Sequence, residues 1–222
     1  MSKRSQLNIA LLACALLYFA FWPTGAEPVA WDAPVPPELS GIYAQNTKLE
    51  KAEKIGIEVG HAGEDVAIDK DGQIYTGYND GRIMRFDPDG KNPKELANTN
   101  GRPLGLDFDN DGGLIIADAD RGLLRLSPDN TLEVLSLGTD SHKLVFTDDV
   151  DVAPDGQIYF SDASSKFSRH NLKKDFIEHQ PHGLLLNYNP LTKTTTIMMR
   201  DLYFANGIAV SPDNTFLLVV ET

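Results

Sequence analysis

Short apolar runs separated by Asp-Gly or Asp-Asn pairs recur four times along the chain after residue 63. In each unit one run leads to a turn at Asp71, Asp111, Asp155 or Asp213, and a second apolar run follows directly. Two such runs joined by an Asp-Gly pair are typical of a β-hairpin. A pattern that returns at intervals of roughly 40 residues is typical of a repeat architecture. The chain is therefore predicted to be all-β, with one sheet for each repeat.

Further apolar runs complete the first three repeats. A third run follows in each of them, and the fourth runs are Pro93–Asn98, Leu132–Leu137 and Thr194–Met199. Four antiparallel strands per repeat form one blade of a β-propeller. The fourth repeat has only its first two strands before Thr222, so we expect an incomplete fourth blade. The polar stretch 163–181 interrupts the third repeat and predicts a long loop over one face.

The N-terminus has the order of a targeting segment. Lys3 and Arg4 precede an apolar run from Leu7 to Trp22, which only Asn8 interrupts. Positive charge before an apolar run is typical of a secretory signal or a signal anchor, and it keeps the charged end in the cytoplasm. We expect an uncleaved membrane anchor over residues 1–26, with a cleaved signal as the alternative. Either places the propeller on the non-cytoplasmic side, which is periplasmic, lumenal or extracellular.

The next segment, 27–40, is rich in proline and predicts an extended spacer before a partial propeller over 41–222. Cys14 is the only cysteine, so a disulfide within the chain is excluded. The formal net charge is −12, and the Lys and Arg residues form no cluster beyond the first few residues. A chain of this charge repels phosphate backbones, so nucleic acid is excluded as a partner class.

Oxygen-bearing side chains occupy the same position in three of the four repeats. Seven residues before the turn aspartate lie Glu64, Leu104, Asp148 and Asn206. Inner strands of a propeller line its central channel, so we expect these side chains to converge on the axis. Hard cations such as Ca²⁺ bind carboxylate and amide oxygens. The pattern predicts a site for calcium, or another divalent cation, at Glu64, Asp148 and Asn206; the alternative is that they only cap strand ends.

Two further acids, Asp65 and Asp149, directly follow Glu64 and Asp148. Strand alternation points them away from the channel, where they either satisfy turns or form a second, deeper metal site. Another acidic run, 107–118, has the spacing of an EF-hand loop. An EF-hand requires flanking helices, whereas the repeat predicts strands on both sides, so we interpret this run as a hairpin turn.

The chain resembles the superfamily of strictosidine synthases, regucalcin-like gluconolactonases and paraoxonases. Within it, the sequence is most similar to the membrane-anchored adipocyte plasma membrane-associated group. The motifs that carry the resemblance are Tyr78-Asn79-Asp80-Gly81-Arg82-Ile83, Arg102-Pro103-Leu104-Gly105-Leu106, Phe160-Ser161-Asp162-Ala163-Ser164-Ser165-Lys166-Phe167 and Phe204-Ala205-Asn206-Gly207-Ile208-Ala209-Val210-Ser211-Pro212-Asp213. This resemblance implies a six-bladed propeller, of which the chain would hold about the first four blades.

The resemblance also implies a calcium ion on the axis, held by Glu64, Asp148 and Asn206. A second, structural calcium would use Asp65 and Asp149. The related proteins usually have Asn where this chain has Asp148.

Catalytic residues of the related enzymes do not carry over. Paraoxonase-like enzymes have a catalytic histidine where this chain has Leu104, and the glutamate of strictosidine synthases would lie beyond Thr222. The resemblance favours a calcium-dependent hydrolase of lactones or aryl esters, with a small-molecule substrate and membrane attachment through the N-terminal segment. The alternatives are a carbon–nitrogen bond-forming enzyme of the strictosidine synthase type and a non-catalytic binding propeller.

Overall fold

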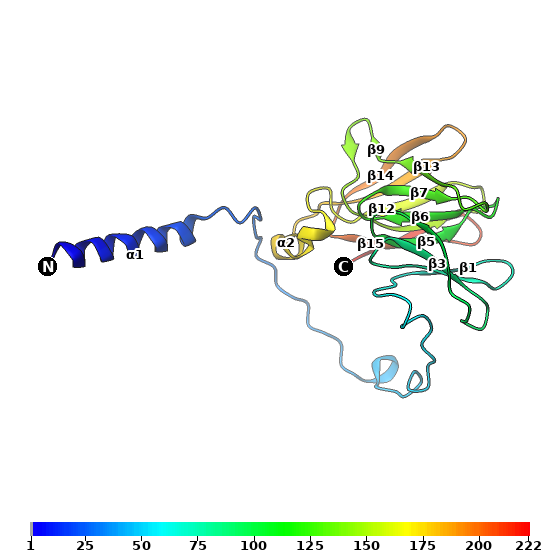
Figure 1. Ribbon diagram of the computed structural model, residues 1–222, viewed down its shortest axis with the longest axis horizontal. Coiled ribbons are helices and arrows are strands. Elements are labelled where there is room, and N and C mark those ends of the chain that lie inside the picture. The colour runs from blue at the N-terminus through cyan, green and yellow to red at the C-terminus, as the bar shows by residue number, and fades with distance from the viewer. Residues whose placement is uncertain (1) are drawn as a thin grey trace.

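The computed structural model describes residues 2–222, so residue 1 of the expected 1–26 anchor lies outside the described part. Helix α1, Lys3–Phe21, extends away from the sheets and has no buried residue (Figure 1). The Ser2 hydroxyl caps its first turn, and the helix stops before Pro23 because a residue that precedes proline disfavours the helical conformation. Within residues 2–222, α1 is the one helix long and apolar enough to cross a membrane. A signal sequence has the same properties.

Most of the remaining regular structure is antiparallel sheet, and each sheet is a meander of consecutive strands. The first sheet contains β1 (Val66–Ile68), β2 (Ile74–Gly77), β3 (Arg82–Phe86) and β4 (Lys94–Asn98). The second contains β5 (Pro103–Phe108), β6 (Leu114–Asp118), β7 (Gly122–Leu126) and β8 (Leu132–Ser136). The third contains β11 (Thr147–Val152), β12 (Ile158–Asp162), β13 (Gly183–Asn189) and β14 (Thr194–Leu202). Strands β15 (Ala205–Val210) and β16 (Leu217–Glu221) form a two-stranded sheet.

The predicted hairpin turns are present, and their chemistry explains the recurring Asp-Gly pairs. In the second sheet the Asp109 Oδ1 atom accepts the backbone N–H groups of Asp111 and Gly113 at 2.9 and 2.7 Å. Gly112 takes φ +79° there, a left-handed conformation that glycine adopts without a Cβ penalty. The run 107–118 is therefore a β-hairpin, as expected, and not an EF-hand loop.

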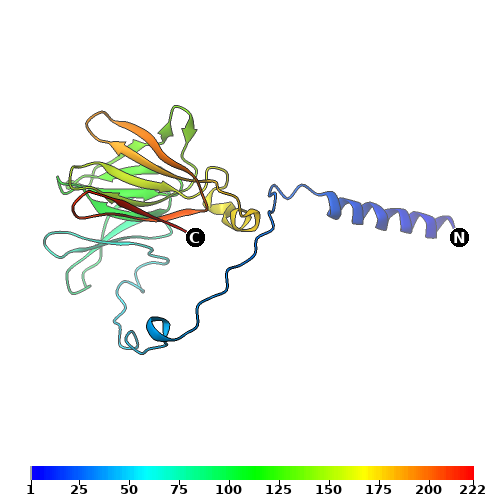
Figure 2. The same cartoon turned by 180° about the vertical axis from the view of Figure 1, so that it is seen from behind.

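The sheets pack face to face in chain order, and side-chain alternation on β6 shows how. Leu114 and Ile116 pack with Ile83 of the first sheet, whereas Ile115 packs with Phe160 of the third. Every residue of β6 is buried, since both faces of the second sheet are covered. This stacking of twisted sheets, which fan out beside one another in Figure 2, is the arrangement of propeller blades. The number of blades in the whole protein stays a prediction.

The insertion at 163–181 differs from the long loop that its polar sequence predicts. It contains a 3₁₀ turn, Arg169–Asn171, and a short helix α2, Leu172–Glu178, which ends at His179 with φ +47°. A small hairpin of β9 (Gly138–Thr139) and β10 (His142–Lys143), which precedes the third sheet and contacts it through His142 and Asp162, was not predicted either. Between α1 and the first sheet, residues 22–65 are irregular apart from a 3₁₀ turn at Gly41–Tyr43.

Candidate functional site

Residues at the start of the inner strands, or just before it, line one pocket. Strand β5 lies against β1 and β11, and β11 lies against β15, so the four inner strands run side by side. A cavity of about 360 Å³ is lined by Glu64, Leu104, Asp148 and Asn206, the four equivalent positions of the repeat. The structure thus brings together the three residues that the sequence predicts as metal ligands.

Arg169 and Arg102 also line the pocket, and sequence reasoning predicted neither; Arg102 is the more buried of the two. Its side chain is only 9% exposed, and its Nη2 atom donates to Glu64 Oε2 at 3.2 Å. Its Nη1 atom is buried without a hydrogen-bond partner. Arg102 begins one of the motifs shared with the related family, which was the only sequence signal for it. A buried arginine beside acids partly neutralises their charge.

Asp148 is the most deeply buried of the three predicted ligands, with 4% of its surface exposed. Burial raises the pKa of its carboxyl to about 7, and the charges of Glu64 and Asp149 add to the increase, whereas Arg102 lowers it. The buried Asp148 carboxyl therefore favours its neutral form more than a free aspartate does, and a nearby cation would favour its charged form.

Asn206 is fixed by its backbone. Its carbonyl accepts the Ser161 hydroxyl at 2.8 Å, and the same hydroxyl accepts the Asp149 N–H at 3.0 Å. Ser161 is fully buried and belongs to β12, so it ties the third sheet to the fourth. This contact holds the Asn206 side chain at the pocket.

Aromatic and aliphatic side chains form an apolar part of the pocket wall. Phe146, Leu172, Phe176 and Phe204 all line it. The Phe204 ring lies 5.4 Å from that of Phe146, edge to face, and 4.9 Å from that of Phe176. Leu172 and Phe176 come from α2, so the unpredicted helix supplies part of this apolar wall. Such a wall is typical of small-molecule sites.

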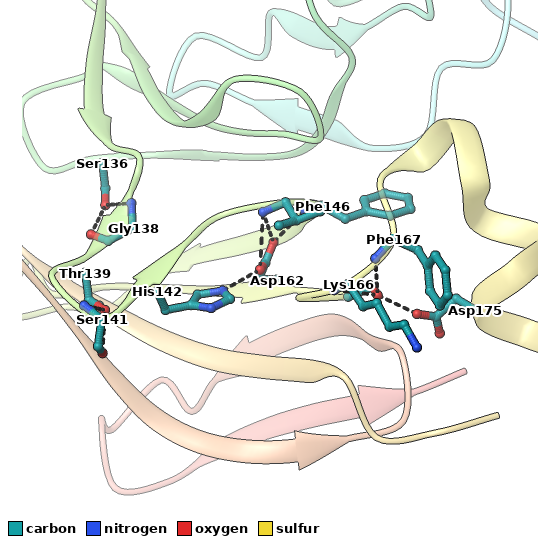
Figure 3. A network of polar contacts seen from close by, with 12 residues as sticks. Ser136, Gly138, Thr139, Ser141, His142, Phe146, Asp162, Lys166, Phe167 and Asp175 are labelled. Atoms are coloured by element: carbon teal, nitrogen blue, oxygen red, sulfur yellow. Dashed lines mark hydrogen bonds and ion pairs between the residues drawn. The ribbon is translucent and has the colours of Figure 1, made fainter. Parts of the chain in front are cut away.

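A buried polar network positions the strand that carries Asp148. Figure 3 shows Asp162, which is fully buried, accepting the Phe146 N–H at 2.7 Å and contacting His142 Nε2 at 3.0 Å. These contacts fix the chain two residues before Asp148. The side chain of His142 is only 13% exposed, since it packs against this carboxylate.

Asp65 and Asp149 join neighbouring sheets. Asp65 Oδ2 accepts the Leu106 N–H at 2.8 Å, and Asp149 Oδ2 accepts the Ile208 N–H at 2.7 Å. Each acid thus bonds to the inner strand of the next sheet, a role that the repeat alone did not reveal. Their part in a second metal site stays a prediction.

The pocket contains the kinds of oxygen ligand that a hard cation binds, but few of them carry a negative charge. Within residues 2–222, no group of three or more His, Cys, Asp or Glu side chains is placed to hold a metal ion. The pocket has two carboxylates, and the third predicted donor, Asn206, is an amide. Carboxylate and amide oxygens suit Ca²⁺, and a cation beside Asp148 would oppose the effects of burial and of the Glu64 charge that raise the pKa of its carboxyl. The residues fit such an ion, which would share Glu64 with Arg102.

Two family models match the chain. The model described as strictosidine synthase matches residues 148–222, and the model described as strictosidine synthase-like, N-terminal, matches residues 41–86. Together they cover more than half of the chain.

Curated relatives agree with these models. The Arabidopsis thaliana protein STRICTOSIDINE SYNTHASE-LIKE 6 is 40% identical over 200 residues, which cover 87% of this chain and 53% of the relative. The adipocyte plasma membrane-associated protein of Danio rerio is 33% identical over 232 residues, which cover 96% of this chain and 55% of the relative. The chain thus spans about half the length of the curated relatives it matches.

Solved structures share the fold. A gluconolactonase from Xanthomonas campestris has a TM-score of 0.60 at 22% identity, over 73% of this chain and 55% of its own. A calcium-binding protein, regucalcin, from Agrobacterium tumefaciens has a TM-score of 0.56 at 17% identity, over 73% and 51%. At these identities the likeness shows the fold alone. On the family models and the curated relatives, the chain belongs to the strictosidine synthase-like family.

Proposed function

We propose that the protein is a calcium-dependent hydrolase of lactones or aryl esters on a six-bladed propeller. The observation that carries the proposal is one pocket that Glu64, Asp148 and Asn206 line together with aromatic and aliphatic side chains. Oxygen donors and aromatic rings in the same pocket suit a cation and an ester with an apolar group. Gluconolactonases of the same fold support the reaction class by analogy, because fold alone does not determine activity.

The chain's own residues have distinct parts in this proposal. Glu64, Asp148 and Asn206 would hold the ion, which supplies Lewis-acid polarisation of a carbonyl group when bound. Arg102 holds the Glu64 carboxylate in place through its 3.2 Å contact. The rings of Phe146 and Phe204 bind the apolar part of the substrate and exclude water from it.

The membrane part of the proposal concerns α1. We infer that α1 anchors the chain with Lys3 and Arg4 in the cytoplasm and the sheets on the non-cytoplasmic side. The name of the adipocyte plasma membrane-associated relatives supports membrane attachment. Protease protection of the full chain in sealed vesicles tests this orientation. A protease added on the cytoplasmic side should leave the sheets intact, and digestion of the sheets from that side would contradict the orientation.

A carbon–nitrogen bond-forming reaction is the second candidate, and the names of the family and of its plant members favour it. The third is a binding propeller without catalysis. Incubating the protein with an amine and an aldehyde distinguishes the two activities. A synthase would consume both compounds together, whereas a hydrolase would consume neither.

The hydrolase is tested with the purified full chain, phenyl acetate and small lactones. Activity should disappear in a chelator and return with Ca²⁺. Glu64→Gln and Asn206→Ala should each abolish it, whereas Glu95→Gln and Asn110→Ala, at exposed positions, should not. Turnover that ignores the metal would contradict the hydrolase mechanism. No turnover together with retained calcium binding would favour the binding propeller.

A further inference from the structure

The segment that follows α1 contacts the insertion at a fully buried acid. Glu178, the last residue of α2, is 0% exposed. Its carboxylate accepts the Glu27 N–H at 2.9 Å and contacts Lys166 Nζ at 2.6 Å and His182 Nε2 at 2.8 Å. A buried carboxylate requires such partners, and one of them is a backbone group of the spacer.

Three more contacts extend this docking along the spacer. The Val29 N–H donates to the Glu178 carbonyl at 3.0 Å, and Gln180 Nε2 donates to the Glu27 carbonyl at 3.0 Å. The Trp31 ring lies 4.9 Å from the ring of His179. Residues 27–31 are therefore held by backbone, amide and ring contacts to the end of α2 (Figure 1).

The same helix forms the pocket wall on its other side. Leu172 and Phe176 line the pocket, and the Phe176 ring packs on Phe204. A helix of seven residues is too short to be stable alone, so its position depends on tertiary contacts. One such contact is the hydrogen bond from the Ser164 hydroxyl to the buried Asp175. The spacer provides another.

We propose that residues 27–31 act as a latch that holds α2 against the pocket. The latch is an interaction surface between the spacer and the Glu178 end of α2, and it links the membrane-side segment to the pocket wall. When the latch is broken, α2 loosens and the contact between Phe176 and Phe204 is lost. The proposal requires the pocket but not hydrolysis, so it stands or falls separately from the proposed activity.

Proline substitutions test the latch because they delete single backbone donors. Glu27→Pro removes the N–H that bonds the Glu178 carboxylate, and Val29→Pro removes the one that bonds its carbonyl. Glu38→Pro lies in the same spacer and is the matched control, since its amide donates no hydrogen bond within the described residues.

The readout is amide hydrogen exchange of the full chain in detergent micelles. Glu27→Pro and Val29→Pro should speed exchange of the 163–182 peptide about tenfold or more, and of the peptide around Phe204 as well, while β6 exchanges as in the wild type. Trypsin should also cut faster after Lys173 and Lys174. Faster exchange in β6 would indicate global loss of structure. In that case the double variant Glu27→Ala and Val29→Ala, which keeps both backbone N–H donors, should show wild-type exchange of the 163–182 peptide.

Two results would overturn the proposal. Wild-type exchange of 163–182 in both proline variants would show that the spacer does not hold α2. Faster exchange of 163–182 with unchanged exchange around Phe204 would show that α2 does not support the pocket wall. Neither result depends on whether the protein hydrolyses an ester, so a failure of the latch proposal is distinguishable from a failure of the proposed hydrolase activity.

Discussion

Replacing the buried acid of the latch, Glu178→Gln, keeps the shape of the side chain and removes its charge. Burial alone would raise the pKa of the Glu178 carboxyl, but hydrogen bonds from Lys166, the Glu27 amide and His182 outweigh it and lower the pKa from 4.5 to about 2. The folded protein therefore favours the ionised form, and the glutamine variant cannot provide it.

The magnitude follows from linkage. A fall in pKa from 4.5 to about 2 corresponds to about 3 kcal/mol of folding stability near neutral pH. Because the folded pKa is the lower one, this stabilisation is complete above about pH 5 and is lost as the pH falls toward about 2. At about pH 3 roughly half of it should remain.

The assay is urea denaturation of the sheets, followed by circular dichroism, at neutral and acid pH. The difference between wild type and Glu178→Gln should be about 3 kcal/mol near neutrality and should shrink as the pH falls. Glu95→Gln, at an exposed position of β4, is the control and should change stability by about 0.5 kcal/mol or less. An equal loss at both pH values, or no loss at either, would refute the electrostatic account of Glu178.

Three further substitutions test the packing and electrostatics of the sheets, each measured by urea denaturation. Phe160→Ala should cost about 3–5 kcal/mol, since this ring is fully buried between the second and third sheets; a loss below about 1 kcal/mol would contradict the face-to-face packing. Burial raises the pKa of Asp107 to about 6, and the neighbouring Asp151 adds to it. The protonated Asp107 carboxyl favours the folded state, and this stabilisation is lost as the pH rises through about 6. The free energy of unfolding of Asp107→Asn should therefore fall less than that of the wild type between about pH 4 and 7, and an equal fall would contradict this account. Gly81→Ala should destabilise by about 1 kcal/mol or more, because φ is +90° and a Cβ would lie 2.5 Å from Asn98 Oδ1; wild-type stability would disprove that strain.

The repeat of short apolar runs was sufficient to predict the sheets and their order. Each Asp-Gly pair marks a local turn, and local chemistry such as the bonds from Asp109 is visible in sequence. Equivalent positions of equivalent strands must lie together, so the shared pocket of Glu64, Asp148 and Asn206 also follows from the repeat.

Contacts between residues far apart in sequence and outside the repeat could not be predicted in this way. Arg102 meets Glu64 across two sheets, and Glu27 meets Glu178 across most of the chain. The sequence of the insertion is polar and predicts an irregular loop. Its short helix was not predicted because tertiary contacts, such as those of Glu178, stabilise it. The inter-sheet role of Asp65 likewise depends on the packing of the sheets.

The central claim is that the pocket binds a calcium ion, and calcium titration of the chelator-treated full chain by calorimetry tests it most directly. The account predicts one saturable site in the wild type and in Glu95→Gln. It predicts the loss of that site in Glu64→Gln and in Asn206→Ala, each with wild-type circular dichroism. Absence of calcium binding in the wild type, or binding that both pocket variants retain, would contradict it.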